Sequence, residues 1–167
     1  MSSLLTEQRH FLGRRLSDAL VIYLRQAGFR VTRHELRRPL GRSVTKIERD
    51  DSGIDSKGDA LLEVSLERAG YLTLGRGYVP WLFITARLLE SRSRRLLSAG
   101  QFSYGADITL DDVDHIASDR RYRYSDFDAL TDHAEDAARG LTVGLPLVAR
   151  RIVSELVSFP QSPGRHG

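Results

Sequence analysis

The hydrophobic residues of this chain follow two different periods, and the change of period limits the folds open to it. From residue 4 to residue 27, apolar side chains recur at steps of three and four, the spacing of one face of an α-helix. Between residues 60 and 104 they alternate with polar side chains, as in strands with one buried face. The helical spacing returns from residue 127. Helices on both sides of a cluster of strands indicate an α+β fold.

The N-terminal third predicts a helix followed by less regular structure. Gly28 is expected to end the helix over residues 4–27, because a residue without Cβ adopts the left-handed conformation beyond a helix end at little cost. Residues 29–33 alternate apolar or β-branched side chains with arginine and predict a strand with one exposed face. Residues 34–58 become polar and rich in turn-forming residues, which predicts an exposed loop.

The middle of the chain predicts a β-meander. Residues 60–68 read as a half-buried strand, and residues 71–78 as a short extended segment between glycines. Residues 81–89 are apolar on both faces for much of their length, which indicates a central strand. A polar turn at 90–95 joins it to a strand at 96–104, and the pair predicts an antiparallel hairpin.

The C-terminal part predicts an acidic connection and then helices. Residues 105–124 are irregular in pattern, so no regular element is expected there. Ser125 is the expected N-cap of a helix reaching about residue 143, because Asp128 follows it three places on and Asp126 favours the positive helix end. Pro146 suits the first turn of a second helix.

Length and composition place these elements in one unit. The chain has 167 residues, of which 41% are hydrophobic, enough to fill a single core. We expect one α+β domain over residues 1–159 and a disordered tail at 160–167. Its sheet is expected to be mostly antiparallel, with four or so strands and with the N-terminal helix and the C-terminal helices packed on one face. No stretch is apolar for long enough to cross a bilayer.

Charge is unevenly distributed along the chain. Residues 1–49 carry 11 basic and 4 acidic side chains, whereas residues 107–136 carry 3 basic and 10 acidic ones. The two segments either attract each other in the fold, face water, or provide a basic face for an anionic partner. The candidate basic patch comprises Arg30, Arg33, Arg37, Arg38 and Arg42. A nucleic-acid-binding protein that uses the basic segment 30–49 is therefore an alternative function, although the segment lacks interleaved aromatic residues.

Residue patterns of known catalytic and metal sites are missing from the sequence. The chain has no cysteine, which excludes disulfides, thiolate metal sites and cysteine nucleophiles. It also lacks the glycine-rich phosphate loops, the nucleophile elbow and the His-Glu-x-x-His motif. The acidic loop 107–115 is expected to be solvated and to pair with Arg120, Arg121 and Arg123; a weak divalent-cation site there is the alternative. We expect no enzymatic activity, cofactor or bound metal.

Aromatic residues near the glycine-rich turns are candidates for contact with a partner. Tyr71, Tyr78 and Trp81 flank a segment punctuated by glycines. Aromatic side chains at such positions can anchor an interface. The alternative is that these rings pack beneath the hairpin, or that the partner contacts an exposed sheet edge instead.

Several stretches together resemble a known group of bacterial proteins. The sequences at 58–64 and 69–71, the apolar strands at 80–89 and 96–105, and the helix start at 124–127 resemble bacterial cell-envelope lipoproteins. This group shares the mixed fold of the TolB N-terminal domain, curli-secretion-like lipoproteins, penicillin-binding-protein activators and ABC-transport auxiliary lipoproteins. The resemblance covers roughly residues 10–157.

The resemblance implies a non-catalytic accessory or interaction module that binds a protein partner in the cell envelope. The lipidated cysteine and leader of the group are not among these residues. We therefore expect a periplasmic or outer-membrane-associated protein if the chain shown begins after a removed leader, and a cytoplasmic protein otherwise.

Overall fold

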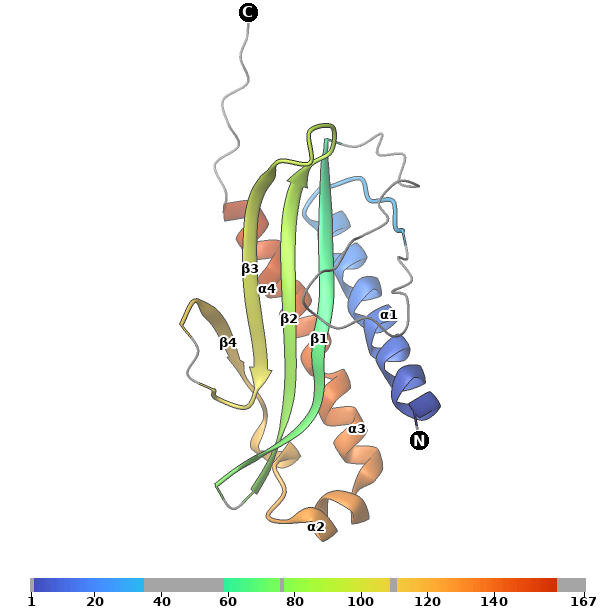
Figure 1. Ribbon diagram of the computed structural model, residues 1–167, viewed down its shortest axis with the longest axis vertical. Helices are drawn as coiled ribbons and strands as arrows, with labels where there is room; N and C mark the ends of the chain where they lie inside the picture. Colours follow the sequence, from blue (N-terminus) through green and yellow to red (C-terminus); the bar gives the residue numbers. More distant parts are fainter. Residues whose placement is uncertain (1, 35–58, 76, 109–110, 159–167) are drawn as a thin grey trace, which may run out of the picture.

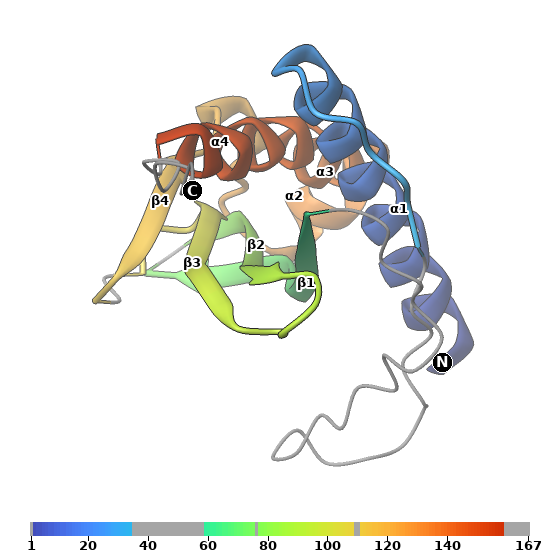
Figure 2. The same ribbon diagram turned by 90° about the horizontal axis from the view of Figure 1, so that it is seen from above.

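The computed structural model describes residues 2–34, 59–75, 77–108 and 111–158. Figures 1 and 2 show a sheet covered on one face by helices. The elements in chain order are α1 (Ser2–Gln26), β1 (Ala60–Leu74), β2 (Gly77–Glu90), β3 (Leu96–Gly105), β4 (Val113–Ala117), the 3-10 helix η1 (Arg120–Tyr122), α2 (Phe127–Asp132), α3 (Ala134–Thr142) and α4 (Gly144–Ser158).

The four strands form one sheet in the order β1-β2-β3-β4. β1 and β2 pair antiparallel along their whole length, from Ala60 opposite Glu90 to Leu74 opposite Gly77. β3 pairs antiparallel with β2, and β4 adds to β3 in parallel. The predicted α+β class, the sheet of four strands and the central position of the strand at 81–89 are confirmed. The parallel β4 makes the sheet mixed.

The core lies between one face of the sheet and the two long helices. α1 contributes a leucine at every fourth residue, so one stripe of the helix faces the strands. In β2, alternate side chains such as Leu82 and Ile84 are completely buried. The other fully or nearly buried core side chains are Leu12, Leu16, Leu20, Leu24, Ala86, Phe102, Tyr104, Leu145, Val148, Ala149, Ile152 and Val153.

A close approach between α4 and β3 fixes the position of α4 on the sheet. Tyr104 is only 1% exposed, and its ring lies directly against the backbone of Gly144. A Cβ atom on Gly144 would come within 2.4 Å of a ring carbon of Tyr104. The first residue of α4 must therefore be glycine for the helix to start at this distance from the sheet.

The predicted strand at residues 29–33 is wrong. Gly28 ends α1 with φ of 94°, as expected, and the Phe29 N–H then donates to the Leu24 carbonyl at 3.0 Å. The chain runs back beside α1 without regular secondary structure, and Figure 2 shows it next to the helix. Val31 packs against the core, and Arg33 forms an ion pair with Asp18 of α1. The alternation at 29–33 thus reflects packing on a helix instead of on a strand.

Three predictions for the C-terminal part also need correction. Residues 105–124, predicted to be irregular, contain β4 and η1. The predicted single helix to residue 143 is broken at His133, whose φ of −114° and ψ of 36° are not helical. Its N-cap is Asp126 instead of Ser125. The second helix, α4, is as predicted: it begins at Gly144, and Pro146 lies in its first turn.

Several predictions fall on residues outside the described ones. These are most of the loop at 34–58, the domain boundary at 159 and the tail at 160–167. They stay predictions.

The contact between Gly144 and Tyr104 predicts the effect of a one-carbon change. Gly144→Ala should lower the free energy of unfolding by about 1–3 kcal/mol, because the added methyl group overpacks the core. Gly13→Ala is the matched control, since no atom lies within 4 Å of a Cβ there. That variant should raise the unfolding free energy by up to about 1 kcal/mol through helix propensity. Urea unfolding measures both; equal effects of the two substitutions would contradict this packing.

Burial of Tyr104 predicts a loss of stability at alkaline pH. Desolvation, with smaller contributions from Tyr122 and Asp119, raises the pKa of Tyr104 from 10.0 to about 12. Between these values the unfolded chain loses the phenol proton and the folded chain keeps it. The unfolding free energy should therefore fall above pH 10, by up to about 1.4 kcal/mol per pH unit from this group. Tyr104→Phe should make that slope shallower in pH-dependent urea unfolding; an unchanged slope would contradict the assignment.

Candidate functional site

The β1–β2 hairpin meets α2 at the lower end of Figure 1. Aromatic side chains from these elements and from the residues beside them contact one another. We call this group the aromatic corner and define it as Tyr71, Tyr78, Tyr124, Phe127 and His133. A two-residue antiparallel bridge joins its two halves. The Tyr78 N–H donates to the Tyr124 carbonyl at 2.7 Å, and the Tyr124 N–H donates to the Tyr78 carbonyl at 3.0 Å. The segment before α2 is therefore fixed to the start of β2 by its backbone.

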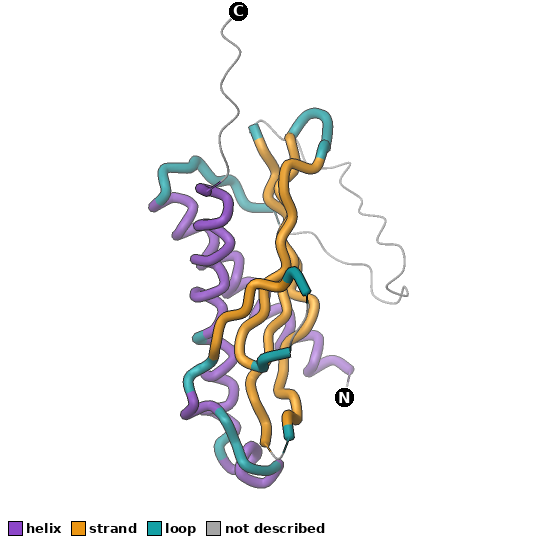
Figure 3. The backbone as a smooth tube through the Cα atoms, turned by 90° about the vertical axis from the view of Figure 1, so that its left-hand side faces the viewer, coloured by secondary structure: helices purple, strands orange, loops and turns teal. Residues whose placement is uncertain are grey.

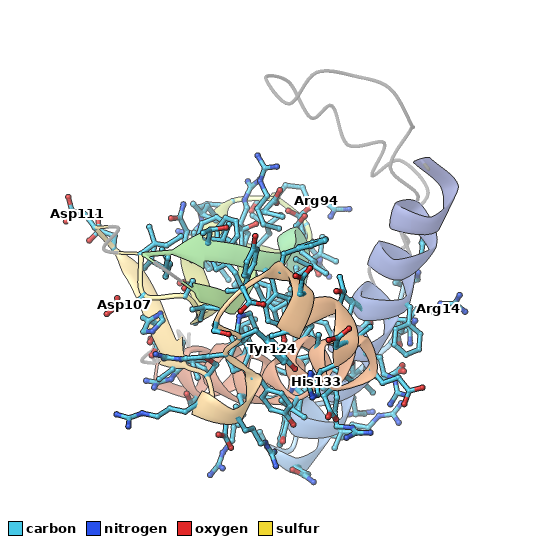
Figure 4. All side chains as sticks on the ribbon, turned by 90° about the horizontal axis from the view of Figure 1, so that it is seen from below. Arg14, Arg94, Asp107, Asp111, Tyr124 and His133 are labelled. Atoms are coloured by element: carbon cyan, nitrogen blue, oxygen red, sulfur yellow. The ribbon has the colours of Figure 1, made fainter. Side chains whose placement is uncertain are left out.

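Ring contacts follow from this bridge. The centroids of Tyr71 and Tyr124 lie 5.7 Å apart, and those of Tyr78 and Phe127 lie 6.2 Å apart. The His133 ring stacks on Tyr124 at 6.1 Å, and Figure 4 shows the two residues side by side. These separations are within the range of favourable aromatic pairs. Phe127 remains 60% exposed although its ring contacts Tyr78.

Tyr71 is the inner member of the aromatic corner. Its hydroxyl group donates to the Ala137 carbonyl of α3 at 3.0 Å. Desolvation, followed by the neighbouring Tyr124, raises the pKa of Tyr71 well above its ordinary value. Desolvation also raises the pKa of Tyr124. Tyr71 therefore attaches α3 to the sheet, and we assign it a packing role.

The N-terminus of α2 holds Phe127 in place. The Oδ1 atom of Asp126 accepts the Ala129 N–H at 2.8 Å, and its Oδ2 atom accepts the Ser125 hydroxyl at 2.7 Å. The Ala129 bond, with a smaller contribution from Ser125, lowers the pKa of the Asp126 carboxyl. This N-cap fixes the first turn of a helix of only six residues. Phe127, the first residue of that turn, is thus presented to solvent from a fixed backbone.

The three aromatic residues singled out by sequence do not form one surface. Tyr71 and Tyr78 both lie at the aromatic corner. Trp81 is an odd number of residues from Tyr78 along β2, so its side chain lies on the other face of the sheet, where its ring centroid is 6.2 Å from that of Phe83. Tyr124 and Phe127 are not among the contact residues predicted from the sequence; the signal that could have indicated them is the capping sequence at 124–127.

The acidic loop does not converge on a site. Asp114 and His115 are neighbours in β4 and therefore point to opposite faces of the sheet. The Asp114 carboxylate pairs with Arg151 at 3.5 Å, whereas Nδ1 of His115 lies 3.2 Å from Oγ of Ser103. Figure 4 shows Asp107 and Asp111 at the outer edge near β4.

The predicted partners of these acidic residues need correction. Arg121 pairs with Asp119 at 3.2 Å, not with the acidic loop, and the cation beside Asp114 comes from α4. Within the part of the chain that the structure describes, no three His, Asp or Glu side chains lie close enough together to hold a metal ion.

The basic patch is described only in part. Arg30 is exposed, and Arg33 pairs with Asp18. Arg37, Arg38 and Arg42 lie outside the described residues. Only two of the five arginines are among the described residues, so the basic patch and the nucleic-acid alternative stay predictions.

None of the described helices combines the length and the apolar content that a bilayer crossing requires. No family model matches the sequence, and no curated protein matches it. The chain is similar to the solved structure of a candidate lipoprotein from Caulobacter crescentus CB15, with 13% sequence identity over 90% of this chain and 87% of that chain, at a TM-score of 0.35. A likeness this distant carries no functional argument.

Proposed function

We propose that this chain is a non-catalytic binding module of the cell envelope that recognises a protein partner through the aromatic corner. The proposal rests on the position of Phe127, which is 60% exposed. Its ring contacts the Tyr78 ring, and its backbone belongs to the capped first turn of α2. A fixed aromatic side chain loses little conformational entropy when a partner covers it. Such residues are typical of the centres of protein interfaces.

The distribution of reactive groups supports binding over catalysis. Catalytic sites bring complementary groups to one place. Here His115 and His133 lie on β4 and between α2 and α3, and Figure 1 shows these elements at different parts of the molecule. The Ser103 hydroxyl contacts His115, but Ser103 is only 2% exposed. A substrate therefore has no access to that hydroxyl.

Placement in the cell envelope is supported by the sequence resemblance alone. The strands at 80–89 and 96–105 and the helix start at 124–127 carry that resemblance. In the structure these stretches correspond to β2, β3 and the capped start of α2, so the corner residues are part of the resembling region.

Localisation gives the first test of this proposal. The gene should be expressed from its own locus with its upstream DNA and an epitope tag, and the cells should be fractionated. We expect the product in the periplasmic or membrane fraction. Product confined to the cytoplasm, with cytoplasmic and periplasmic marker proteins correctly separated, would contradict the envelope placement.

The role of Phe127 gives the second test. When partners are captured from cells by chemical cross-linking to the tagged protein, Phe127→Ala should reduce recovery of the partner at least about fivefold. Loss of an interface anchor costs more than about 1 kcal/mol of binding free energy. The unfolding free energy should change by less than about 1 kcal/mol, since the side chain is largely exposed.

Ile22→Ala is the matched control, because Ile22 is an apolar residue of similar exposure, 54%, on α1. That variant should recover the partner at the wild-type level. Equal recovery from the wild type and the Phe127 variant would contradict the assignment of the corner.

A further inference from the structure

The outer edge of β3 is only half covered by β4. β4 pairs with Gln101–Gly105, and no described strand pairs with residues 96–100 on that side. Burial follows the same division: residues 102–105 are buried, whereas Leu96, Leu97 and Ala99 are exposed. We call residues 96–100 the distal β3 edge.

This edge lacks two of the features that usually prevent pairing, charged side chains and proline. Proteins protect free strand edges with charged side chains, especially lysine, or with proline. The distal β3 edge reads Leu96, Leu97, Ser98, Ala99, Gly100 and contains neither. A register shift opposite Leu88 and Leu89 makes the edge irregular at residues 96–97, its hairpin end. Residues 98–100 pair regularly with β2 and directly adjoin the stretch that β4 covers. An extended segment could continue the line of β4 along this edge.

A groove lies beside the same edge. Figure 3 shows the sheet and the helical layer diverging toward this end of the molecule. The groove has a volume of about 200 Å³ and is lined by β3 residues 98–102 and by α4. Its apolar lining includes Leu62, Leu88, Phe102 and Ile152, and its acidic lining is Asp112, Asp114 and Glu155.

The charges of the groove determine which side chain fits it. Asp114 is paired with Arg151 at 3.5 Å, and Arg87, which also lines the groove, is paired with Glu63 at 3.8 Å. Asp112 and Glu155 form no ion pair with any described residue. An apolar groove with two unpaired carboxylates complements a side chain that has an aliphatic stem and a cationic end, which is lysine or arginine.

We propose that the distal β3 edge accepts an extended segment of a partner protein as an added strand, with a lysine or arginine of that segment in the groove between β3 and α4. Because alternate residues of a strand share a face, the segment should carry basic residues at every second position. This surface lies at the opposite end of the sheet from the aromatic corner, so either surface can fail a test without the other (Figure 1).

The probe for this proposal is an acetylated and amidated peptide of four Lys-Val repeats, with four Glu-Val repeats as the charge control. Peptide is titrated into the isotope-labelled full chain, and backbone amide shifts are followed by NMR. We expect the Lys-Val peptide to shift the amides of Ser98–Gln101 and of Asp112, and the Glu-Val peptide to leave them unchanged at the same concentration.

Charge removal tests the groove directly. The double variant Asp112→Asn with Glu155→Gln should weaken binding of the Lys-Val peptide about fivefold, the effect of two exposed charge contacts. Asparagine is chosen because Asp112 has φ of 63°, a conformation that asparagine tolerates. The matched control, Asp128→Asn with Asp132→Asn, removes two exposed carboxylates from α2 and should leave the affinity unchanged.

Three results would overturn the proposal: no shift at residues 98–101 with the Lys-Val peptide, shifts confined to another surface, or equal weakening by the two double variants. A free protein that already forms a dimer through the distal β3 edge would also overturn it, because a second copy would then be the occupant. Phe127→Ala should not change the affinity for the Lys-Val peptide. A Phe127 variant that loses its partner but still binds the peptide would show that the aromatic corner and the distal β3 edge act independently.

Discussion

The packing of α1 and α4 on one face of the sheet is the interaction on which the other features depend. Tyr104 is central to it, because its ring is buried between β3 and the first turn of α4, and only a glycine at position 144 allows that approach. Once α4 is fixed there, α3 and α2 must lie at the end of the sheet where β1 and β2 turn. The aromatic corner is the product of that placement.

Two parts of the sheet extend beyond what the helices and β4 cover. At one end the hairpin of β1 and β2 is bridged to the segment before α2, and Phe127 is left exposed. At the other end β3 continues past β4 with an unpaired edge beside an acidic groove. Both features are built on hydrogen-bonded backbone, and a backbone that is already ordered lowers the entropic cost of binding. These two features are the basis for our proposal that the chain is a scaffold that presents surfaces to other proteins.

Periodicity in the sequence predicted the elements that contribute most to the core. The leucine stripe of α1, the alternation in β1 and the apolar run of β2 each reflect burial of many side chains in one layer. β4 was missed because it has only five residues, two of which are Asp114 and His115, and because its parallel partner is defined by tertiary contact. Residues 29–33 were misassigned because alternation alone does not distinguish a strand from a segment packed on a helix.

The candidate site could be predicted only in part, because it too depends on tertiary contacts that the local sequence pattern does not show. Strand parity alone places Tyr78 and Trp81 on opposite faces, so their separation was available from the sequence. The exposure of Phe127 could not be predicted from the sequence, because that exposure depends on the helix break at His133. The break shortens α2 to six residues. In an unbroken helix the Phe127 side chain would belong to the apolar stripe of residues 130, 134 and 141.

Site-specific photo-crosslinking in living cells is the sharpest test of the proposal that this chain is a scaffold with a partner at the aromatic corner. A benzophenone amino acid is placed at position 127 and, for comparison, at position 147, where leucine is 46% exposed on α4. We expect one discrete protein adduct from position 127 and none from position 147. No adduct from position 127, or the same adducts from both positions, would contradict it.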